Sequence, residues 1–380
     1  MARTWDIFCS VVDNFGDIGV CWRLARQLSS ELGQSVRLWV DDLASFHRLC
    51  RGVDSARASQ RVGGVEIRHW SVPFPRIEPA DIVIEGFGVR LPDACIEAMA
   101  ARQPQPVWIN LEYLSAESWV EGCHGLPSPQ PGLPLVKHFF FPGFTSATGG
   151  LLMESGLAQA RDAFQSDPAA RAAFRRSLGL APPDGAALWV SLFCYDNTAL
   201  PALVEAWVAD ALPVVCIVPA SKVLAQLTHI TGQTIAAGTG IELGSLSIQA
   251  IPFLELDHYD RLLWACDVNF VRGEDSFVRA QLAARPLVWQ AYPQEEGAHL
   301  RKTSAFLERY ARALGSDVGP VYCALTEAWN REAADVGRGW TALRSHRQAL
   351  ADHARGWAGQ LADGGNLAIR LAEFCENRLK

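Results

Sequence analysis

Two aspartates four residues apart occupy a glycine-containing stretch near the N-terminus of this 380-residue sequence. Residues 11–20 read V-V-D-N-F-G-D-I-G-V, which places Asp13 and Asp17 directly after an apolar run. Gly16 and Gly19 would let a substrate approach the backbone closely, so a carboxylate here could act as a general base. The alternative is that Asp17 only caps the helix that follows. Capping alone would not account for Asp13.

A second polar cluster follows Val268–Val271, a run that is apolar except for Asn269. Its members are Arg272, Gly273, Glu274, Asp275 and Ser276. If Ser276 starts a helix, the N–H groups of the helix N-terminus and the Arg272 guanidinium would together bind a diphosphate. The alternative is an ordinary turn in which Ser276 is the N-cap and the acidic side chains complement the helix dipole.

Aromatic residues stand near the ends of two apolar runs in the second half of the chain. These are Phe193 and Tyr195 in S-L-F-C-Y-D, and Phe253 in I-P-F-L. A nucleotide base needs a flat apolar surface with main-chain polar groups beside it, and such residues could supply both. Most of the 13 tryptophans and 17 phenylalanines must nevertheless be core residues.

Several common motifs are missing from the sequence. No G-x-G-x-x-G follows the first strand, which disfavours a nicotinamide dehydrogenase. Neither a phosphate-binding G-x-x-x-x-G-K-[ST] nor a hydrolase G-x-S-x-G occurs. The sequence also has no D-x-D and no paired histidines at metal-ligand spacing. We therefore expect a metal-independent mechanism in which protein groups hold the diphosphate.

These clusters must be positioned by the elements around them, and the first half of the chain alternates β-rich runs with amphipathic ones. The predicted strands are Trp5–Val12, Ser35–Val40, Val65–Trp70, Asp81–Glu85 and Pro106–Leu111. Between the first two, apolar residues from Ile18 to Leu32 recur at helical spacing, and Gly33 stands at the C-cap position. Strand, helix, strand is the signature of a parallel sheet, so residues 1–153 are predicted to form a Rossmann-like domain.

The second half repeats this alternation. Strands are predicted at Ala187–Phe193, Val214–Pro219, Leu246–Phe253, Val268–Val271 and Pro286–Tyr292, with helices at Ala199–Ala211 and Asp257–Cys266. Residues 185–330 are therefore predicted to form a second Rossmann-like domain, after a helical linker at 154–184 and before a helical connection at 331–355. Open parallel sheets bind ligands at the carboxyl ends of their strands, so we expect the two domains to share one crevice.

Bulk properties narrow the class of protein further. The formal net charge of −7 disfavours a nucleic-acid partner, which needs a basic face. Ten cysteines are scattered singly without a C-x-x-C pair, which indicates a reducing compartment. Asp6 interrupts any signal-peptide core, and no apolar run approaches the ~18 residues that span a bilayer. We expect a cytoplasmic protein with no membrane partner.

The two polar clusters also resemble those of a known family. With D-N-F-G-D-I-G at 13–19 and F-V-R-G-E-D-S-F-V-R-A-Q at 270–281, the chain resembles the EarP family, bacterial protein-arginine rhamnosyltransferases that modify translation elongation factor P. Further similar stretches are N-L-E-Y-L-S-A-E-S-W at 110–119, F-F-F-P-G-F-T at 139–145, S-L-F-C-Y at 191–195 and Y-P-Q-E-E at 292–296. The resemblance covers both predicted domains.

The resemblance implies a GT-B fold, an α/β architecture of two Rossmann-like domains facing each other across a cleft, with residues 356–380 packing back on the first domain. It implies transfer of L-rhamnose from dTDP-β-L-rhamnose to an arginine of elongation factor P, with inversion and without a metal or other cofactor. It also implies that Asp17 is the general base, Asp13 its companion, and Glu274 a residue needed for activity. Donor contacts are expected from Asn14, Phe15, Gly16, Phe193, Tyr195, Phe253, Arg272, Gly273, Asp275 and Ser276.

Arginine is a difficult nucleophile because its guanidinium stays protonated, with a pKa above about 12. We hypothesise that Asp13 and Asp17 clamp the acceptor guanidinium while Asp17 accepts a proton, and that Arg272 and the Ser276 helix terminus stabilise the leaving diphosphate. Two other functions stay open: a GT-B enzyme with a small-molecule or glycan acceptor, and a non-catalytic nucleotide-sugar-binding protein.

Overall fold

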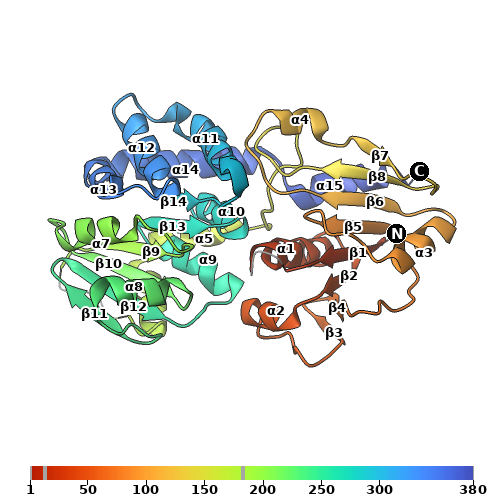
Figure 1. The fold of residues 1–380 in the computed structure, drawn as a ribbon, viewed down its shortest axis with the longest axis horizontal. Coiled ribbons are helices and arrows are strands. Elements are labelled where there is room, and N and C mark those ends of the chain that lie inside the picture. The colour runs from red at the N-terminus through yellow and green to blue at the C-terminus, as the bar shows by residue number, and fades with distance from the viewer. Residues whose placement is uncertain (1, 12–14, 181–184, 380) are drawn as a thin grey trace. The chain divides into compact units, whose positions relative to one another are not determined.

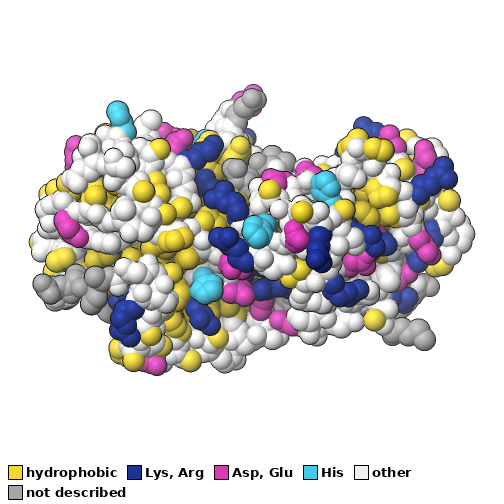
Figure 2. All heavy atoms as spheres, turned by 90° about the horizontal axis from the view of Figure 1, so that it is seen from below, with side chains coloured by type: hydrophobic (Ala, Val, Ile, Leu, Met, Phe, Trp, Pro, Cys, Tyr) yellow, Lys and Arg dark blue, Asp and Glu magenta, His cyan; other side chains and the backbone are white. Residues whose placement is uncertain are grey.

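The computed structural model describes residues 2–11, 15–180 and 185–379, so Asp13 and Asn14 lie outside the described residues. The chain divides into two compact units (Figure 1). The first unit combines Met1–Ser155 with Leu361–Lys380, and the second is Gly156–Gln360. On the face shown in Figure 2, basic and acidic side chains are interspersed.

The first unit is built on a sheet with the order β3-β4-β2-β1-β5-β6-β8-β7. Its strands are β1 (Thr4–Cys9), β2 (Ser35–Val40), β3 (Ser59–Val62), β4 (Val65–His69), β5 (Ile82–Gly86), β6 (Val107–Leu111), β7 (Pro127–Pro129) and β8 (Val136–Phe140). All neighbours pair in parallel except the outermost strands β3 and β7. The helices of this unit are α1 (Gly16–Ser30), α2 (Leu43–Leu49), α3 (Asp93–Ala101), α4 (Trp119–Cys123) and α15 (Leu367–Glu376).

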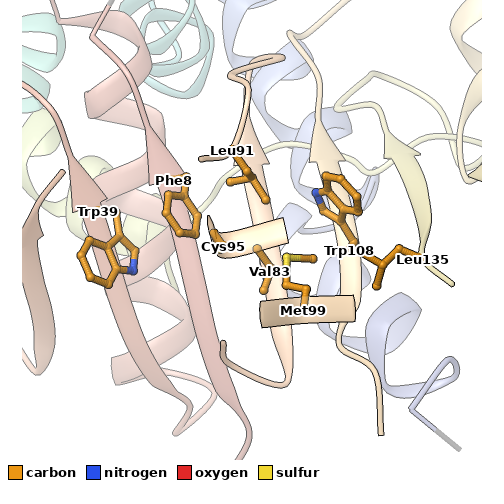
Figure 3. Close-up of a cluster of buried hydrophobic side chains, with 8 residues drawn as sticks. All are labelled: Phe8, Trp39, Val83, Leu91, Cys95, Met99, Trp108 and Leu135. Carbon is orange, nitrogen blue, oxygen red and sulfur yellow. The ribbon is translucent and has the colours of Figure 1, made fainter. Parts of the chain in front are cut away.

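Both faces of this sheet are packed against helices, because successive side chains of a buried strand point to opposite faces. Phe8 of β1 joins a buried cluster with side chains of α3 (Figure 3). The cluster comprises Phe8, Trp39, Val83, Leu91, Cys95, Met99, Trp108 and Leu135. The neighbouring residue Cys9 points to the other face and interacts with Cys21 of α1. The central strands are therefore held in place from both sides.

The C-terminal segment of the chain completes the first unit. Leu151 forms a parallel bridge with Asn366, and the Leu367 N–H donates to the Leu151 carbonyl at 2.9 Å. Farther along α15, the Phe374 ring contacts Phe140 at a centroid distance of 5.3 Å. These contacts attach α15 to the sheet that carries the N-terminal acidic motif.

The second unit has a sheet with the order β11-β12-β10-β9-β13-β14. Its strands are β9 (Leu188–Leu192), β10 (Val214–Pro219), β11 (Gly240–Leu243), β12 (Leu246–Ile251), β13 (Val268–Arg272) and β14 (Leu287–Gln290). Among the described strands of this sheet, only the edge strand β11 pairs antiparallel. The helices are α5 (Leu157–Ser166), α6 (Pro168–Ser177), α7 (Leu200–Val208), α8 (Val223–Thr231), α9 (Leu256–Ala265), α10 (Asp275–Leu282), α11 (Ala298–Tyr310), α12 (Val318–Asn330) and α13 (Val336–Arg344), followed by α14 (Arg347–Asp363), which ends in the first unit. Two short 3-10 helices, Glu295–Gly297 and Ala311–Ala313, flank α11.

The residues that we predicted to be a linker, 154–184, contain α5 and α6, and both helices belong to the second unit. Arg161 of α5 donates from Nη1 to the Leu282 carbonyl at 2.8 Å. Gln165 of the same helix donates to the Ala283 carbonyl at 2.9 Å. These bonds tie α5 to the C-terminal end of α10, the helix that follows the second polar motif.

The predicted strands of both halves occur in the structure, with ends that differ by up to three residues. Ser35–Val40 and Val214–Pro219 match the predicted ranges, whereas the first strand ends at Cys9 rather than Val12. Four further strands, β3, β7, β8 and β11, were not predicted. The first helix ends at Ser30, and Gly33 follows with a left-handed φ of 64°. Across the described residues, no helix is both long and apolar enough to cross a membrane.

Candidate active site

In the first sheet, the chain adds strands first on one side of β1 and then on the other, so the strand order reverses at the centre of the sheet. From β1 the chain moves to β2 and β4 on one side, and later to β5, β6 and β8 on the other. Because β1 and β5 are adjacent and parallel, the loops after them diverge and leave a site at their carboxyl ends. The sequence motif with the two aspartates follows β1, so its described part lies at this position.

Asp17 is at this edge, in the first turn of α1, and only 2% of its surface is exposed. The residue at the N-cap position is Phe15, which has no side-chain cap bond. The interpretation of Asp17 as the helix cap is therefore wrong, because Asp17 lies one residue inside the helix. The Tyr113 hydroxyl donates a hydrogen bond to Asp17 Oδ1 at 3.1 Å. A buried carboxylate at a ligand-binding edge is a candidate base.

Tyr113 is held by the loops that follow β5 and β6. Its ring stacks on Phe87 with a centroid distance of 4.6 Å and an interplanar angle of 23°. Phe87 has a left-handed φ of 61°, and its N–H donates to the Leu111 carbonyl at 2.7 Å. Gly88 N–H donates to the Asn110 side chain at 3.2 Å. The ends of two adjacent strands, β5 and β6, therefore position the tyrosine that contacts Asp17.

The other predicted residues of the N-terminal motif have different surroundings. Phe15 contacts Arg48 of α2, whose guanidinium carbon lies 5.0 Å from the ring centroid. Gly16 is the first residue of α1, one residue before Asp17. Their assignment as donor contacts stays a prediction, as do the assignments of Asp13 and Asn14.

In the second sheet, the chain moves from β9 to β10 and β12 on one side and later to β13 and β14 on the other. The strand order therefore reverses between β9 and β13. Phe193 and Tyr195 follow β9, and Arg272 is the last residue of β13. The Arg272 guanidinium carbon lies 4.5 Å from the Phe193 ring centroid and 4.5 Å from that of Tyr195. Such contacts hold a guanidinium through cation–π attraction while leaving its N–H groups available to an anion. The predicted aromatic residues and the predicted arginine therefore form one group.

The turn from Arg272 to Ser276 differs in detail from the prediction. The helix α10 begins at Asp275, with Glu274 as N-cap residue and no side-chain cap bond. The expectation that Ser276 starts the helix or caps it is wrong, because Ser276 lies in its first turn. Its hydroxyl donates to the Arg272 carbonyl and accepts from the Arg272 N–H at 3.2 Å. Gly273 has a φ of 63°, a left-handed conformation that glycine adopts without steric cost.

This arrangement turns the chain back sharply after β13 and holds it there. Asp275 and Ser276 are buried, with 8% and 7% of their surfaces exposed, while Glu274 is half-buried. The Trp289 indole donates to the Gly273 carbonyl at 2.8 Å, and the Gly273 N–H donates to the Gln290 carbonyl at 3.3 Å. The backbone that directly follows Arg272 is thus held by two hydrogen bonds to β14.

Gln290 at the end of β14 is a further residue of this group. Its side-chain oxygen accepts from the Tyr195 N–H at 2.8 Å, and only 2% of its surface is exposed. Tyr292, half exposed, packs its ring edge-on to that of Tyr195 at 5.3 Å. The third predicted aromatic residue, Phe253, lies just after β12, two strands from β9 in the sheet.

Cys194 lies between two of the aromatic residues but is chemically inert. Burial raises the pKa of its thiol to about 12, and the nearby Arg272 charge reduces this effect only in part. The thiol therefore stays protonated near neutral pH. All ten cysteines lie in the described part of the chain and are free thiols. Among the described residues, no three His, Cys, Asp or Glu side chains are grouped so that they could hold a metal ion.

The comparison with known proteins decides the family. The model of the family "Elongation-Factor P (EF-P) rhamnosyltransferase EarP" matches residues 5–376. The chain belongs to the EarP family. A protein-arginine rhamnosyltransferase of Pseudomonas putida is 50% identical over 380 residues, which are the full length of both chains. Membership of this family makes the chain an enzyme, a glycosyltransferase of the protein-arginine rhamnosyltransferase class.

Solved structures support the same assignment. A structure described as the structural basis for EarP-mediated arginine glycosylation of translation elongation factor EF-P is 37% identical and has a TM-score of 0.72, covering 99% of both chains. The kitacinnamycin glycotransferase is 12% identical with a TM-score of 0.50 over the full length of both chains, which shows the fold alone. The predicted α/β fold of GT-B type is thereby confirmed.

Three residues of the candidate site were not predicted. Tyr113 lies in the stretch N-L-E-Y-L-S, where family similarity was noted but no role was assigned. Phe87 and Gln290 carried no signal beyond their positions at the ends of predicted strands. Such positions are where side chains of parallel sheets reach ligands, and this could have singled them out.

Proposed function

We propose that this chain transfers L-rhamnose from dTDP-β-L-rhamnose to an arginine side chain of translation elongation factor P. The acceptor is supported by the description of the family model and by that of the solved EarP structure. The observation that carries the chemistry is Asp17, a buried carboxylate at the central carboxyl edge of the first sheet, oriented by the Tyr113 hydroxyl.

The donor is assigned to the corresponding edge of the second sheet. The nucleotide base stacks on the aromatic residues that follow β9, while the Arg272 guanidinium binds the diphosphate. Support comes from the geometry, since Arg272 lies over the Phe193 and Tyr195 rings and stands two residues before the N-cap residue of α10. Glu274, half-buried at the N-cap position, is assigned to the rhamnose hydroxyls.

Ser276 has a different role from the one that its sequence position first indicated. Its hydroxyl is engaged on both sides by the backbone of Arg272. We therefore assign Ser276 to holding the turn that presents Arg272, rather than to a direct bond with the diphosphate.

The reaction forms one bond and breaks one. A guanidinium nitrogen of the acceptor arginine attacks the anomeric carbon of rhamnose, and the bond between that carbon and the dTDP oxygen breaks. The electron pair leaves with dTDP, and the proton of the attacking nitrogen passes to Asp17. Attack from the face opposite the leaving group converts the β-linked sugar into an α-linked product.

The acidic residues also solve the problem of the nucleophile. The acceptor guanidinium is protonated and delocalised, so a carboxylate bonded to it must localise its electrons as the new bond forms. Asp17 does this from a buried position, where electrostatic interactions are stronger than in water. Asp13, four residues earlier, is assigned to the same guanidinium. Leaving-group charge is stabilised by Arg272 and the α10 N-terminus, so the proposal needs no metal.

The direct test combines the protein with elongation factor P and dTDP-β-L-rhamnose, and analyses the product by tandem mass spectrometry. One added deoxyhexose on an arginine side chain is expected, and the same yield in the presence of EDTA. If elongation factor P stays unmodified and the donor is consumed only when a glycan or small molecule is added, that molecule would be the acceptor in place of elongation factor P. If the donor binds but no sugar is transferred to any acceptor, the protein would instead be a nucleotide-sugar-binding protein without catalytic activity.

A further inference from the structure

A pocket of about 520 Å³ opens at the amino-terminal edge of the second sheet, opposite the edge that carries Arg272. It is lined by residues at the starts of β9 and β13, by the residues before β14, and by the end of α13, the segment after it and the first turns of α14. None of these residues takes part in the proposed reaction. A volume of this size is sufficient for a ligand as large as a nucleotide.

Four arginines and a single acidic side chain line this pocket. The arginines are Arg285, Arg344, Arg347 and Arg355, and the acid is Asp267. Two of the arginines have carboxylate partners outside the pocket, since Arg344 pairs with Asp210 and Arg355 with Asp352. The lining therefore carries an excess of positive charge in a protein whose net charge is −7.

The other two arginines, Arg285 and Arg347, have no ion-pair partner among the described residues. The Nε–H of Arg285 is buried and has no hydrogen-bond acceptor within the described protein. Burial lowers the pKa of Arg285, Asp267 opposes this shift, and the charges of Arg171 and Arg355 add to it. Several guanidinium groups thus repel one another in one place, an arrangement that a bound anion would stabilise.

The helix that begins at the pocket adds to its preference for anions. Arg347 is the first residue of α14, a helix of 17 residues, and Gln348 and Ala351 of its first turns also line the pocket. The N–H groups of a helix N-terminus have no intrahelical acceptors, and the helix dipole places partial positive charge there. Leucine side chains at positions 188, 343 and 350 form an apolar part of the lining.

We propose that this pocket is a second ligand site, which binds a phosphorylated small organic molecule through its phosphate groups. The guanidinium groups of Arg285 and Arg347 match phosphate oxygens in geometry and charge, and the apolar lining accommodates the remainder of the ligand. The site is separate from the donor site, because it uses the opposite ends of β9, β13 and β14.

The test measures binding of inorganic pyrophosphate and of thymidine diphosphate to the full-length protein by calorimetry. Arg347→Gln, an exposed substitution that folding should tolerate, is expected to weaken pocket binding about tenfold, as loss of one charge-assisted bond would. Combined with Arg285→Gln it should abolish this binding. Arg338→Gln removes an equally exposed arginine outside the pocket and should leave binding unchanged.

Arg272→Ala separates this site from the donor site. In that variant the pocket should still bind pyrophosphate, and hydrogen exchange of residues 343–355 should slow when the ligand is added. Stronger binding of thymidine diphosphate than of pyrophosphate to the Arg272→Ala variant would show that the apolar lining contacts the organic part. The proposal would be overturned if Arg347→Gln and the double variant bound pyrophosphate as tightly as Arg338→Gln does. Loss of all pyrophosphate binding in Arg272→Ala would also overturn it.

Discussion

Replacing Tyr113 by phenylalanine isolates one hydrogen bond of the proposed active site. The substitution removes only the hydroxyl that donates to Asp17 Oδ1 at 3.1 Å. The ring remains and can keep its stacking contact with Phe87 at 4.6 Å. Any effect on turnover therefore reports how far this bond orients the proposed base.

The size of the effect follows from the geometry of the bond. A hydrogen bond to a charged group contributes roughly 1.5–3 kcal/mol. The bond to Asp17 is longer than the 2.5–2.7 Å of a strong hydroxyl–carboxylate bond, and 36% of the Tyr113 surface is exposed, so water can replace part of it. We therefore take a value just below this range, about 1.4 kcal/mol, which corresponds to a tenfold decrease in kcat.

The assay is steady-state transfer of rhamnose to elongation factor P, with KM for the donor measured separately. Tyr113→Phe should lower kcat about tenfold and leave the donor KM unchanged, because Tyr113 follows a strand of the first sheet whereas Arg272, the proposed diphosphate ligand, ends a strand of the second. Tyr113→Ala should lower kcat further, since it also removes the aromatic pair with Phe87. Wild-type kcat in Tyr113→Phe would refute a role of the hydroxyl in orienting Asp17.

Three further predictions concern the donor site, the core and the pH dependence of stability. Arg272→Ala should weaken dTDP binding at least tenfold by calorimetry, because it removes the proposed charge-assisted contact with the diphosphate. Asp260→Asn should lower the free energy of unfolding by about 3–5 kcal/mol in urea titrations, since it disrupts a buried two-bond pair with Arg279. Burial lowers the pKa of His124, so below pH ~6.5 the unfolded state binds protons that the folded state does not. Stability should therefore fall as pH decreases from 7 to 5, and less steeply in His124→Gln.

Matched controls distinguish these effects from general damage. Glu327→Gln breaks an exposed ion pair with Arg331 and should change stability by at most about 1 kcal/mol. A loss as large as that of Asp260→Asn would show that burial is not the cause. Unchanged dTDP affinity in Arg272→Ala would remove Arg272 from the diphosphate site. An equally steep pH dependence in His124→Gln would assign the acid sensitivity to other groups.

The central strands could be predicted because buried parallel strands are short, continuous apolar runs bounded by polar turns. Ser35–Val40 and Val214–Pro219 are of this kind, and their bounds match the structure. The strands β3 and β11 escaped prediction because they lie at sheet edges, where the residues alternate between exposed and half-buried. Their sequences do not differ enough from those of polar loops.

The site residues that the sequence predicted lie at the carboxyl end of a predicted strand or in the few residues after it. Arg272, Phe193 and Tyr195 come together because β9 and β13 are neighbours, which the alternation of strands and helices makes plausible. The bond between Tyr113 and Asp17 joins residues 96 positions apart and depends on the pairing of β1, β5 and β6. The start of α10 at Asp275 was missed because Ser276 satisfies the backbone of Arg272 instead of capping the helix.

The central claim is that Asp17 accepts the proton of the acceptor arginine, and single-turnover transfer by Asp17→Asn tests it most directly. This variant keeps the size of the side chain and an oxygen that can accept from Tyr113. We predict unchanged dTDP-β-L-rhamnose affinity by calorimetry and a rate of arginine rhamnosylation lowered about 10²-fold or more. A single-turnover rate close to that of the wild type would contradict the account.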